Sequence, residues 1–422
     1  MRVVIVGNGI AANAFAVALH EYGAKADILC LAAERHPSYD PCSLPYYVSG
    51  HIAEKDMFRP PLLRNKVLKL DVRYGDPVTE LRPSTRTVHT REGKEYQYDW
   101  LVLAHGGYSF TLPVPGVDLH GVFGCKQMDE ALALREHPGQ RAVVVGSGAI
   151  GVEAAEALKI KGYKSVTIVE LLPNIVPTMF DEPAARLLQA DLEQAGIQVL
   201  CGEKVQAIEG GAACETVVTD KRRIPCDTVV LAVGVVAGRA LGETGGLTVN
   251  RGIVVDRLMR TSDPHILACG DCAESVDAIS GEPCLYQLKH NAIEQARVAA
   301  STVLGRGTEY RGAYPFARIH FFGTHSGSFG QTWRLLQDKT GAETLDRTTP
   351  QGYLRLILKD DRIVGGQAVG EIAGYMGLFI GAMWRGDRVS ILREQWKTIC
   401  SLQSPWPPMY RTLGRLLGFP AL

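Results

Sequence analysis

The chain carries the same strand–helix–strand pattern twice. Residues 2–31 and residues 141–170 align without a gap, at a constant offset of 139 residues. In each copy a run of β-branched residues meets a glycine turn, an alanine-rich stretch of helical period follows, and a second apolar strand closes the unit. Such units build doubly wound sheets, so the repeat predicts an α/β fold with two Rossmann-like nucleotide-binding domains.

Each copy is followed by short alternating segments that end on a similar phrase. The phrases lie at 98–107 and 226–234, and each places an aspartate before a buried strand that ends in glycine. This is typical of the exit strand of a doubly wound sheet. From Tyr314 the pattern changes to aromatic-rich strands and a hairpin turning at 360–362, which predicts a separate C-terminal α+β module.

Composition limits the partners that this chain can have. Lys plus Arg and Asp plus Glu both total 45, so we expect no binding to nucleic acid or to an anionic membrane surface. The longest uncharged apolar run, 372–383, is shorter than the ~18 residues of a membrane span and is interpreted as core or interface. The ten cysteines are scattered along the chain, which fits a reducing compartment. Apolar residues 3–6 run into a glycine turn without a cleavage site, unlike a signal peptide. Together these features predict a cytoplasmic location.

The first copy contains Gly7-Asn8-Gly9 followed by Ala12, which is a dinucleotide-binding fingerprint. Gly7 permits a tight turn, Gly9 lets the backbone approach a pyrophosphate, and the small Ala12 lets the helix pack on the strand. The phosphates then lie at a helix N-terminus. A ribose-binding acid should follow the second strand; Glu34 is the candidate, and a solvated loop glutamate is the alternative.

The second fingerprint, Gly146, Gly148 and Gly151, is complete, and Glu170 ends the next strand. Because Glu170 is followed by apolar residues and no Arg or Lys stands ready for a 2′-phosphate, the expected cofactor is NADH rather than NADPH. Glu153, two residues into the helix, is either a polar contact near the nicotinamide or a first-turn glutamate favoured by the helix dipole.

Five motifs follow one another along the chain: the two fingerprints, the phrases at 104–106 and 232–234, and a late Gly270-Asp271. With them the chain resembles the FAD-dependent pyridine nucleotide-disulfide oxidoreductase superfamily over nearly its whole length. The resemblance implies FAD at the first fingerprint, NADH at the second, and Gly270 and Asp271 on the ribitol or phosphate side of FAD. It also implies an FAD-binding domain from 1–110 and 241–312, an NAD-binding domain at 111–240 and a C-terminal interface domain at 313–422.

Residues 38–50 look like the active-site segment of the single-cysteine branch, with Cys42 in the place of the redox cysteine. Tyr47 stands where the glutathione reductase type has a second cysteine, so no internal redox disulfide of that kind is expected. If Ser43 caps the next helix, the helix dipole favours a Cys42 thiolate. The alternative for Cys42 is a buried small hydrophobic residue.

The resemblance leaves the second redox partner open. In coenzyme A-disulfide reductases interface-domain tyrosines reach the active cysteine, whereas residues 404–410 here place the tyrosine beyond the prolines. The segment around Cys42 is also similar to NADH-oxidising subunits of iron–sulfur complexes of the phenylglyoxylate dehydrogenase type. The leading expectation is therefore an NAD(H)-reacting electron-transfer subunit with an iron–sulfur partner.

Two other functions stay open at the level of sequence. One is a single-cysteine reductase of small disulfides, or an NADH oxidase, acting through Cys42. The other is a redox sensor that holds FAD and NAD without turnover. The resemblance further implies an oligomer or a complex subunit, because the C-terminal module would form an interface.

Overall fold

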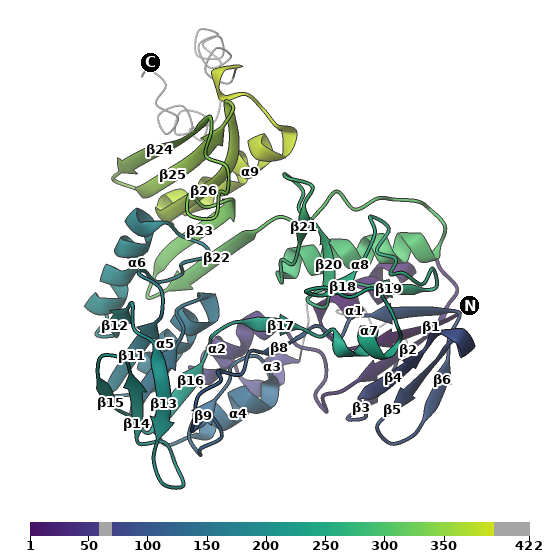
Figure 1. Cartoon of the computed structure of the whole chain (residues 1–422), viewed down its shortest axis with the longest axis horizontal. Helices are drawn as coiled ribbons and strands as arrows, with labels where there is room; N and C mark the ends of the chain where they lie inside the picture. Colours follow the sequence, from purple (N-terminus) through teal and green to yellow (C-terminus); the bar gives the residue numbers. More distant parts are fainter. Residues whose placement is uncertain (59–69, 392–422) are drawn as a thin grey trace. The chain divides into compact units, whose positions relative to one another are not determined.

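The computed structural model of the chain describes residues 1–58 and 70–391 (Figure 1). The chain forms two compact units. Unit 1 contains Met1–Pro113, Val117–Gly139 and Val230–Tyr314. Unit 2 contains Val114–Gly116, Gln140–Val229 and the described residues from Pro315 onwards.

Unit 1 is built on a parallel sheet of five strands in the order β19-β7-β1-β2-β3. This is the doubly wound arrangement that the first repeat predicts. The strands are β1 (Arg2–Val6), β2 (Asp27–Ala32), β3 (Asp71–Tyr74), β7 (Trp100–Leu103) and β19 (Ile266–Ala268). The β-branched residues of β1 are buried, and the phrase at 98–107 supplies β7, as expected of an exit strand.

Two long helices of unit 1, α1 (Ile10–Glu21) and α8 (Lys289–Val303), pack against each other. Both helices are rich in buried alanines, among them Ala14 and Ala18 on α1 and Ala296 and Ala299 on α8. Small residues let helix axes approach closely. The core of unit 1 thus joins the beginning of the chain to a helix near residue 300.

Smaller elements complete unit 1. The short helices are η1 (Pro41–Ser43), α2 (Leu44–Val48), α3 (Glu54–Met57), η3 (Pro83–Thr85), α4 (Met128–Glu136) and α7 (Ala240–Thr244). One small sheet contains β4 (Val78–Arg82), β5 (Thr87–Thr90) and β6 (Glu95–Gln97), and another contains β18 (Ile253–Val254), β20 (Ala273–Val276) and β21 (Pro283–Cys284). The strands β8 (Gly107–Ser109) and β17 (Val235–Ala237) form an antiparallel ribbon, and β9 spans Val122–Phe123.

Unit 2 repeats the same topology with strands in the order β12-β11-β10-β16. They are β10 (Arg141–Val145), β11 (Ser165–Glu170), β12 (Gln198–Cys201) and β16 (Thr228–Leu231), and the helices α5 (Ala149–Lys161) and α6 (Glu182–Gln194) belong to the same fold. Arg141 pairs in parallel with Ser165 as Arg2 pairs with Asp27 in unit 1. The predicted α/β fold with two Rossmann-like domains is confirmed.

Two antiparallel sheets accompany this fold in unit 2. The first contains β13 (Val205–Glu209), β14 (Thr216–Thr219) and β15 (Arg223–Pro225). The second, of the C-terminal module, has the order β22-β23-β26-β25-β24. Its strands are β22 (Phe316–Phe321), β23 (Thr324–Gly330), β24 (Ala342–Thr349), β25 (Gly352–Lys359) and β26 (Arg362–Gly370), and η4 (Glu371–Tyr375) and α9 (Met376–Arg385) follow.

The expected hairpin of the C-terminal module is confirmed. Asp360 and Asp361, between β25 and β26, have φ angles of 50° and 62°, which suit the tight turns that join twisted strands. The apolar run at 372–383 forms η4 and most of α9, and Ile372 and Phe379 in it are fully buried within the chain. This confirms the interpretation of the run as core at these positions.

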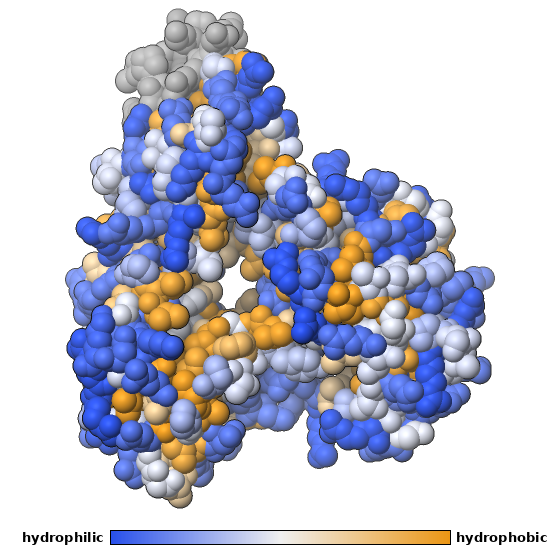
Figure 2. Space-filling view, viewed as in Figure 1, coloured by the Kyte–Doolittle hydropathy of each residue, from blue (hydrophilic) through white to orange (hydrophobic). Residues whose placement is uncertain are grey.

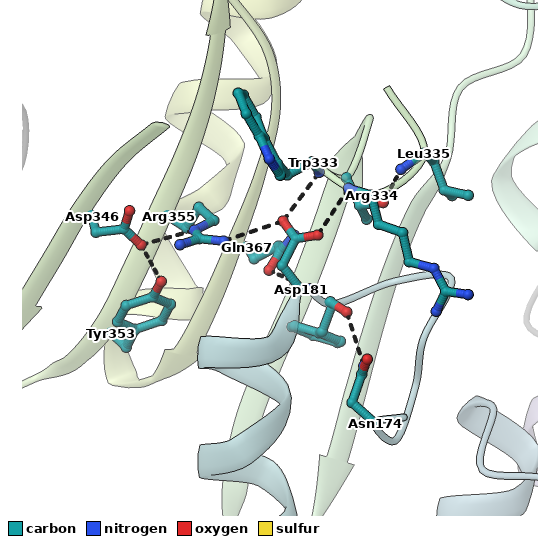
Figure 3. Close-up of polar contacts among 11 residues, drawn as sticks. Asn174, Asp181, Trp333, Arg334, Leu335, Asp346, Tyr353, Arg355 and Gln367 are labelled. Carbon is teal, nitrogen blue, oxygen red and sulfur yellow. Dashed lines mark hydrogen bonds and ion pairs between the residues drawn. The ribbon is translucent and has the colours of Figure 1, made fainter. Parts of the chain in front are cut away.

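Within unit 2 a buried carboxylate joins α6 to the C-terminal module (Figure 3). Asp181, directly before α6, accepts hydrogen bonds from the backbone N–H groups of Trp333 and Arg334 at 3.1 and 3.2 Å. The Gln367 amide donates to it at 2.7 Å, and the Arg355 guanidinium lies 3.6 Å away. Asp181 is 7% exposed, so these contacts satisfy an otherwise costly buried charge.

The surface is largely polar on the face shown in Figure 2, with apolar areas between hydrophilic ones. In residues 1–58 and 70–391 no helix is both long and apolar enough to cross a membrane. The residues at 404–410, on which the expectation about interface tyrosines depends, lie outside the described residues.

Candidate cofactor sites

The first fingerprint forms a cradle at the end of β1. Gly7 has φ +107°, and a Cβ there would lie 2.3 Å from the Ala104 carbonyl oxygen, so only glycine fits. Gly9 is the N-cap of α1 without a side-chain cap, and a Cβ there would meet nothing within 4 Å. Open space in front of free helix N–H groups is what a pyrophosphate needs. Ala12 is buried and lets α1 pack.

Gly270 and Asp271 lie beside this cradle. Gly270 has φ +79°, and a Cβ on it would lie 3.0 Å from the Ala11 Cβ of α1. Its N–H donates to the Gln295 side chain of α8 at 2.8 Å. Asp271 is therefore held next to the N-terminal end of α1, where its carboxylate lies 3.2 Å from the Lys126 ammonium. The structure brings together the residues that the sequence predicts for FAD, and Lys126 is an addition that sequence spacing did not indicate.

Glu34 lies two residues after β2 and is half-buried. Its carboxylate accepts a hydrogen bond of 2.8 Å from the Tyr39 hydroxyl, which in turn accepts one of 3.0 Å from the Met128 N–H. Burial, followed by the charge of Glu34, raises the pKa of Tyr39, so the hydroxyl stays a donor. Glu34 is thus a fixed acid at the strand end rather than a freely solvated loop glutamate, and a ribose role stays a prediction.

Cys42 lies exposed in the single turn η1. Its backbone N–H donates to the Asp40 carboxylate at 3.1 Å, so Asp40 caps this turn. Ser43 stands at the N-cap position of α2, but its side chain makes no capping hydrogen bond because its backbone is already helical. The condition that Ser43 caps the next helix is therefore not met, and the alternative of a buried small hydrophobic residue is wrong for Cys42.

An ion pair fixes the Cys42 turn to α8. The second carboxylate oxygen of Asp40 pairs with the ammonium of Lys289, the first residue of α8. Asp40 and Lys289 are 249 residues apart in sequence, so no local pattern indicates their contact. Tyr47, in the place of a second cysteine, is buried, with the Arg135 guanidinium 4.3 Å above its ring.

The second fingerprint repeats the cradle in unit 2. Gly146 has φ +94°, and its N–H donates to the Val169 carbonyl at 2.8 Å. Gly148 is the N-cap of α5 without a side-chain cap, and a Cβ on it would again meet nothing within 4 Å. Gly151 is buried, as expected of the small position where helix meets strand. The space and the helix end fit a second dinucleotide.

Glu170, the last residue of β11, is 7% exposed. One of its oxygens accepts hydrogen bonds from the Ser147 N–H at 2.9 Å and the Ser147 hydroxyl at 2.6 Å. The other accepts one from the Leu172 N–H at 2.8 Å. A carboxylate has about four acceptor positions, so one remains for a ribose hydroxyl. A 2′-phosphate would meet this negative charge instead.

Glu153 lies in the second turn of α5 and is half-buried. Burial, with a smaller contribution from the charge of Glu156, raises the pKa of Glu153 to about 8. Glu156 itself accepts a 2.6 Å hydrogen bond from the Phe322 N–H. Glu153 is therefore protonated over most of the neutral range. A carboxyl that keeps its proton suits a hydrogen-bond donor, whereas a first-turn glutamate favoured by the helix dipole would be ionised.

His105 is a half-buried residue that sequence reasoning missed. It follows β7, and its Nε2 lies 2.6 Å from the Gly238 carbonyl oxygen, so Nε2–H donates. Burial lowers the pKa of His105, and its Nδ1 is buried with no hydrogen-bond partner among the described residues. The histidine is thus neutral and holds the ends of two chain segments together beside Gly7.

The Cys269–Cys272 pair flanks Gly270 and Asp271 but is fully buried. Burial raises the pKa of both thiols, that of Cys272 to about 12, and the Cys272 thiol donates to the Leu103 carbonyl at 3.3 Å. In the part of the chain that the structure describes, no group of three or more His, Cys, Asp or Glu residues is arranged to hold a metal. These two cysteines serve the packing of β19 and β7.

The chain is similar to a known protein family and to several known proteins. The family model described as pyridine nucleotide-disulphide oxidoreductase matches residues 1–302. An NADH oxidase of Methanocaldococcus jannaschii is 29% identical over 411 residues, covering 90% of this chain and 91% of that protein. An electron transfer subunit of the assimilatory nitrate reductase of Bacillus subtilis is 28% identical, covering 93% of this chain but only 50% of its own length.

Among solved structures, an NAD-dependent persulfide reductase from A. fulgidus superimposes with a TM-score of 0.88. It is 28% identical to this chain, and the match covers 93% of this chain and 79% of that one. The similarity thus extends past residue 302 into the C-terminal module.

Proposed function

This chain belongs to the pyridine nucleotide-disulphide oxidoreductase family, and from that premise we propose that it is the NAD(H)-reacting electron-transfer subunit of an iron–sulfur oxidoreductase complex. It is an FAD-dependent NAD(H) oxidoreductase, and what it exchanges electrons with is the part that we propose. With both nucleotides bound, unit 1 would hold the FAD that takes or gives a hydride and unit 2 would hold the NAD(H) that supplies or receives it, and the partner would exchange single electrons with the flavin. Bound FAD supplies this two-electron to one-electron conversion.

Unit 1 holds and orients FAD in this proposal. The open space at Gly9 takes the pyrophosphate, with the N-terminus of α1 facing its charge. Asp271 would lie against the ribitol or phosphate side of FAD, accepting hydrogen bonds only from ribitol hydroxyls, and Lys126 would partly balance the negative charges of Asp271 and the pyrophosphate. Glu34 accepts from the adenosine ribose at the end of β2. The N-terminus of α8, together with Lys289, favours a negative charge near it.

Unit 2 holds NADH in the same manner. Gly146, Gly148 and Gly151 shape the cradle, and Glu170 accepts from the ribose hydroxyls. Glu170 selects NADH over NADPH because a buried carboxylate repels a phosphate. Glu153 donates its proton in a hydrogen bond near the nicotinamide, which its raised pKa allows at neutral pH.

One observation carries the choice of a protein partner. The turn with Cys42 holds a single thiol, because the second position is a buried Tyr47 under Arg135. Electrons from the flavin therefore cannot collect on an internal dithiol in this turn, and an external acceptor must take them. The relative named as an electron transfer subunit supports a protein acceptor.

The specific observation that favours a second function is the exposure of Cys42. An exposed thiol in a turn that is fixed to α8 can attack a small disulfide. The relatives named NADH oxidase and persulfide reductase support this reductase or oxidase function.

The test is a Cys42→Ser variant assayed with two acceptors. The electron-transfer proposal predicts that NADH-to-viologen activity stays within about twofold of wild type, since the thiol takes no part. If the chain reduces coenzyme A disulfide rapidly and Cys42→Ser abolishes that activity, the reductase function holds instead. Ser43→Ala is the matched control, because it alters the same turn without removing the thiol.

A second measurement addresses the partner directly. Affinity purification of the chain from its native host should recover an iron–sulfur protein in a fixed ratio, and the complex should reduce its clusters with NADH. Recovery of a homodimer with full turnover on a small disulfide contradicts the subunit proposal.

A further inference from the structure

A pair of cysteine thiols lies away from both nucleotide cradles, in the small sheet of unit 2. Cys214 lies two residues before β14, and Cys226 directly follows β15. The backbone joins them, because Thr216 pairs with Pro225 and the Cys226 N–H donates to the Glu215 carbonyl at 2.9 Å. The two cysteines are thus brought together by one β-hairpin.

The side chains of this pair hydrogen-bond to each other. Cys214 is 3% exposed and Cys226 is 1% exposed, yet their neighbours Ala213, Glu215 and Pro225 are all exposed. The thiols therefore lie directly beneath the surface of this hairpin. A small neutral oxidant reaches such a site more readily than a bulky disulfide.

The two thiols differ in acidity. The hydrogen bond from the Cys226 thiol lowers the pKa of Cys214. The same hydrogen bond, together with burial, raises the pKa of Cys226. Cys214 is therefore the thiol that reacts first as a thiolate, and Cys226 keeps its proton until Cys214 has been modified.

We propose that Cys214 and Cys226 are a peroxide-reactive modification site that closes to an intrachain disulfide. The Cys214 thiolate attacks one oxygen of hydrogen peroxide, the O–O bond breaks, and Cys214 becomes a sulfenic acid while the second oxygen leaves as water after taking a proton. The Cys226 sulfur then attacks the Cys214 sulfur and displaces a second water. Overall two thiols and one peroxide give one disulfide and two waters.

The surroundings of the pair favour closure over further oxidation. Asp227, next to Cys226, accepts hydrogen bonds from the N–H groups of Gln140 and Arg141 at 2.8 and 3.0 Å. These contacts hold Cys226 against the start of β10, so the resolving thiol stays beside Cys214. The disulfide would close a short loop and tie the hairpin of β14 and β15, leaving the second fingerprint untouched.

The experiment treats the full chain with hydrogen peroxide and maps its cysteines by mass spectrometry. We expect the peptides of Cys214 and Cys226 to become joined with loss of two hydrogens, and dithiothreitol to restore both thiols. In Cys226→Ser, a sulfenic acid should be trapped at Cys214 by dimedone, about tenfold above the trapping at Cys226 in Cys214→Ser.

The buried pair Cys269 and Cys272 is the internal control, because burial raises the pKa of both of its thiols and peroxide should leave it reduced. Thermal unfolding of each variant shows that it is folded before oxidation. The proposal is overturned if Cys214 and Cys226 remain free thiols in folded chain, if they pair with other cysteines, or if sulfenic acid forms equally at both positions.

Discussion

The two nucleotide cradles are built alike and differ in how each treats its acidic residue. Gly9 and Gly148 both stand before a helix N-terminus with open space in place of a side chain. Glu170 ends its strand, is buried, and is held by Ser147 and Leu172 from its own unit of structure. Glu34 lies past the end of its strand, half-buried, and is held by one tyrosine hydroxyl.

Glu170 and Glu34 also differ in where their hydrogen-bond partners lie along the chain. Glu170 is fixed locally, because its partners are Leu172, two residues later, and Ser147 of the second fingerprint. After Glu34 the chain must continue to the turn that carries Cys42, and its anchors are distant: Tyr39 reaches Met128, and Asp40 reaches Lys289. The cradle of unit 2 thus serves to select its nucleotide, whereas the cradle of unit 1 is followed by a turn that places the Cys42 thiol near α8.

The largest expected effect is on the stability of unit 1, through the tight turn at Gly7. Gly7→Ala places a Cβ against the Ala104 carbonyl at a positive φ, and we expect it to destabilise unit 1 by about 3–5 kcal/mol. Gly9→Ala, in open space, should cost no more than about 1 kcal/mol. Denaturant unfolding of the two variants checks this, and equal destabilisation would remove the distinction between the two glycines.

The second effect concerns the proton on Glu153. Its folded pKa of about 8 exceeds the ordinary value of 4.5, so the associated stability is full below pH 4.5 and is lost as pH rises through 8. The loss should be on the order of 2–4 kcal/mol. Glu153→Gln should remove this pH dependence, whereas Glu182→Gln on the exposed start of α6 should keep it. Urea unfolding at pH 5, 7 and 9 measures both.

The third effect separates the two cradles by ligand. Gly148→Ala fills the open space of unit 2 and should raise the KM for NADH about 10–100-fold while FAD stays bound. Gly9→Ala should do the reverse and weaken FAD by a similar factor, measured by fluorescence of released flavin. Loss of FAD from Gly148→Ala would contradict the assignment of one nucleotide to each cradle.

The smallest effect compares the two acids. Glu170→Gln should lower kcat/KM for NADH about tenfold. It should also reduce the preference for NADH over NADPH, because the negative charge that repels a 2′-phosphate is removed. Glu34→Gln should leave the NADH kinetics unchanged and weaken FAD binding only a few-fold. An unchanged coenzyme preference in Glu170→Gln would count against its ribose role.

Much of this arrangement was predictable from the sequence because it is local. Gly7, Gly146 and Gly270 are needed for their backbone conformations, and a β-branched run before each turn predicts the buried strand. The cap on the Cys42 turn was not predictable, because Asp40 rather than Ser43 provides it through a proline-led turn. The joining of α6 to the C-terminal module was not predictable either, since Asp181 meets its partners through the tertiary fold.

The most direct test of the account is an anaerobic titration of the purified, FAD-loaded full-length chain with NADH, followed at the flavin absorbance band near 450 nm. We expect one FAD per chain and complete bleaching with about one equivalent of NADH, since hydride transfer delivers two electrons. A chain that takes up no flavin, or a bound flavin that stays oxidised in excess NADH, would contradict the central claim that the two cradles serve one electron path.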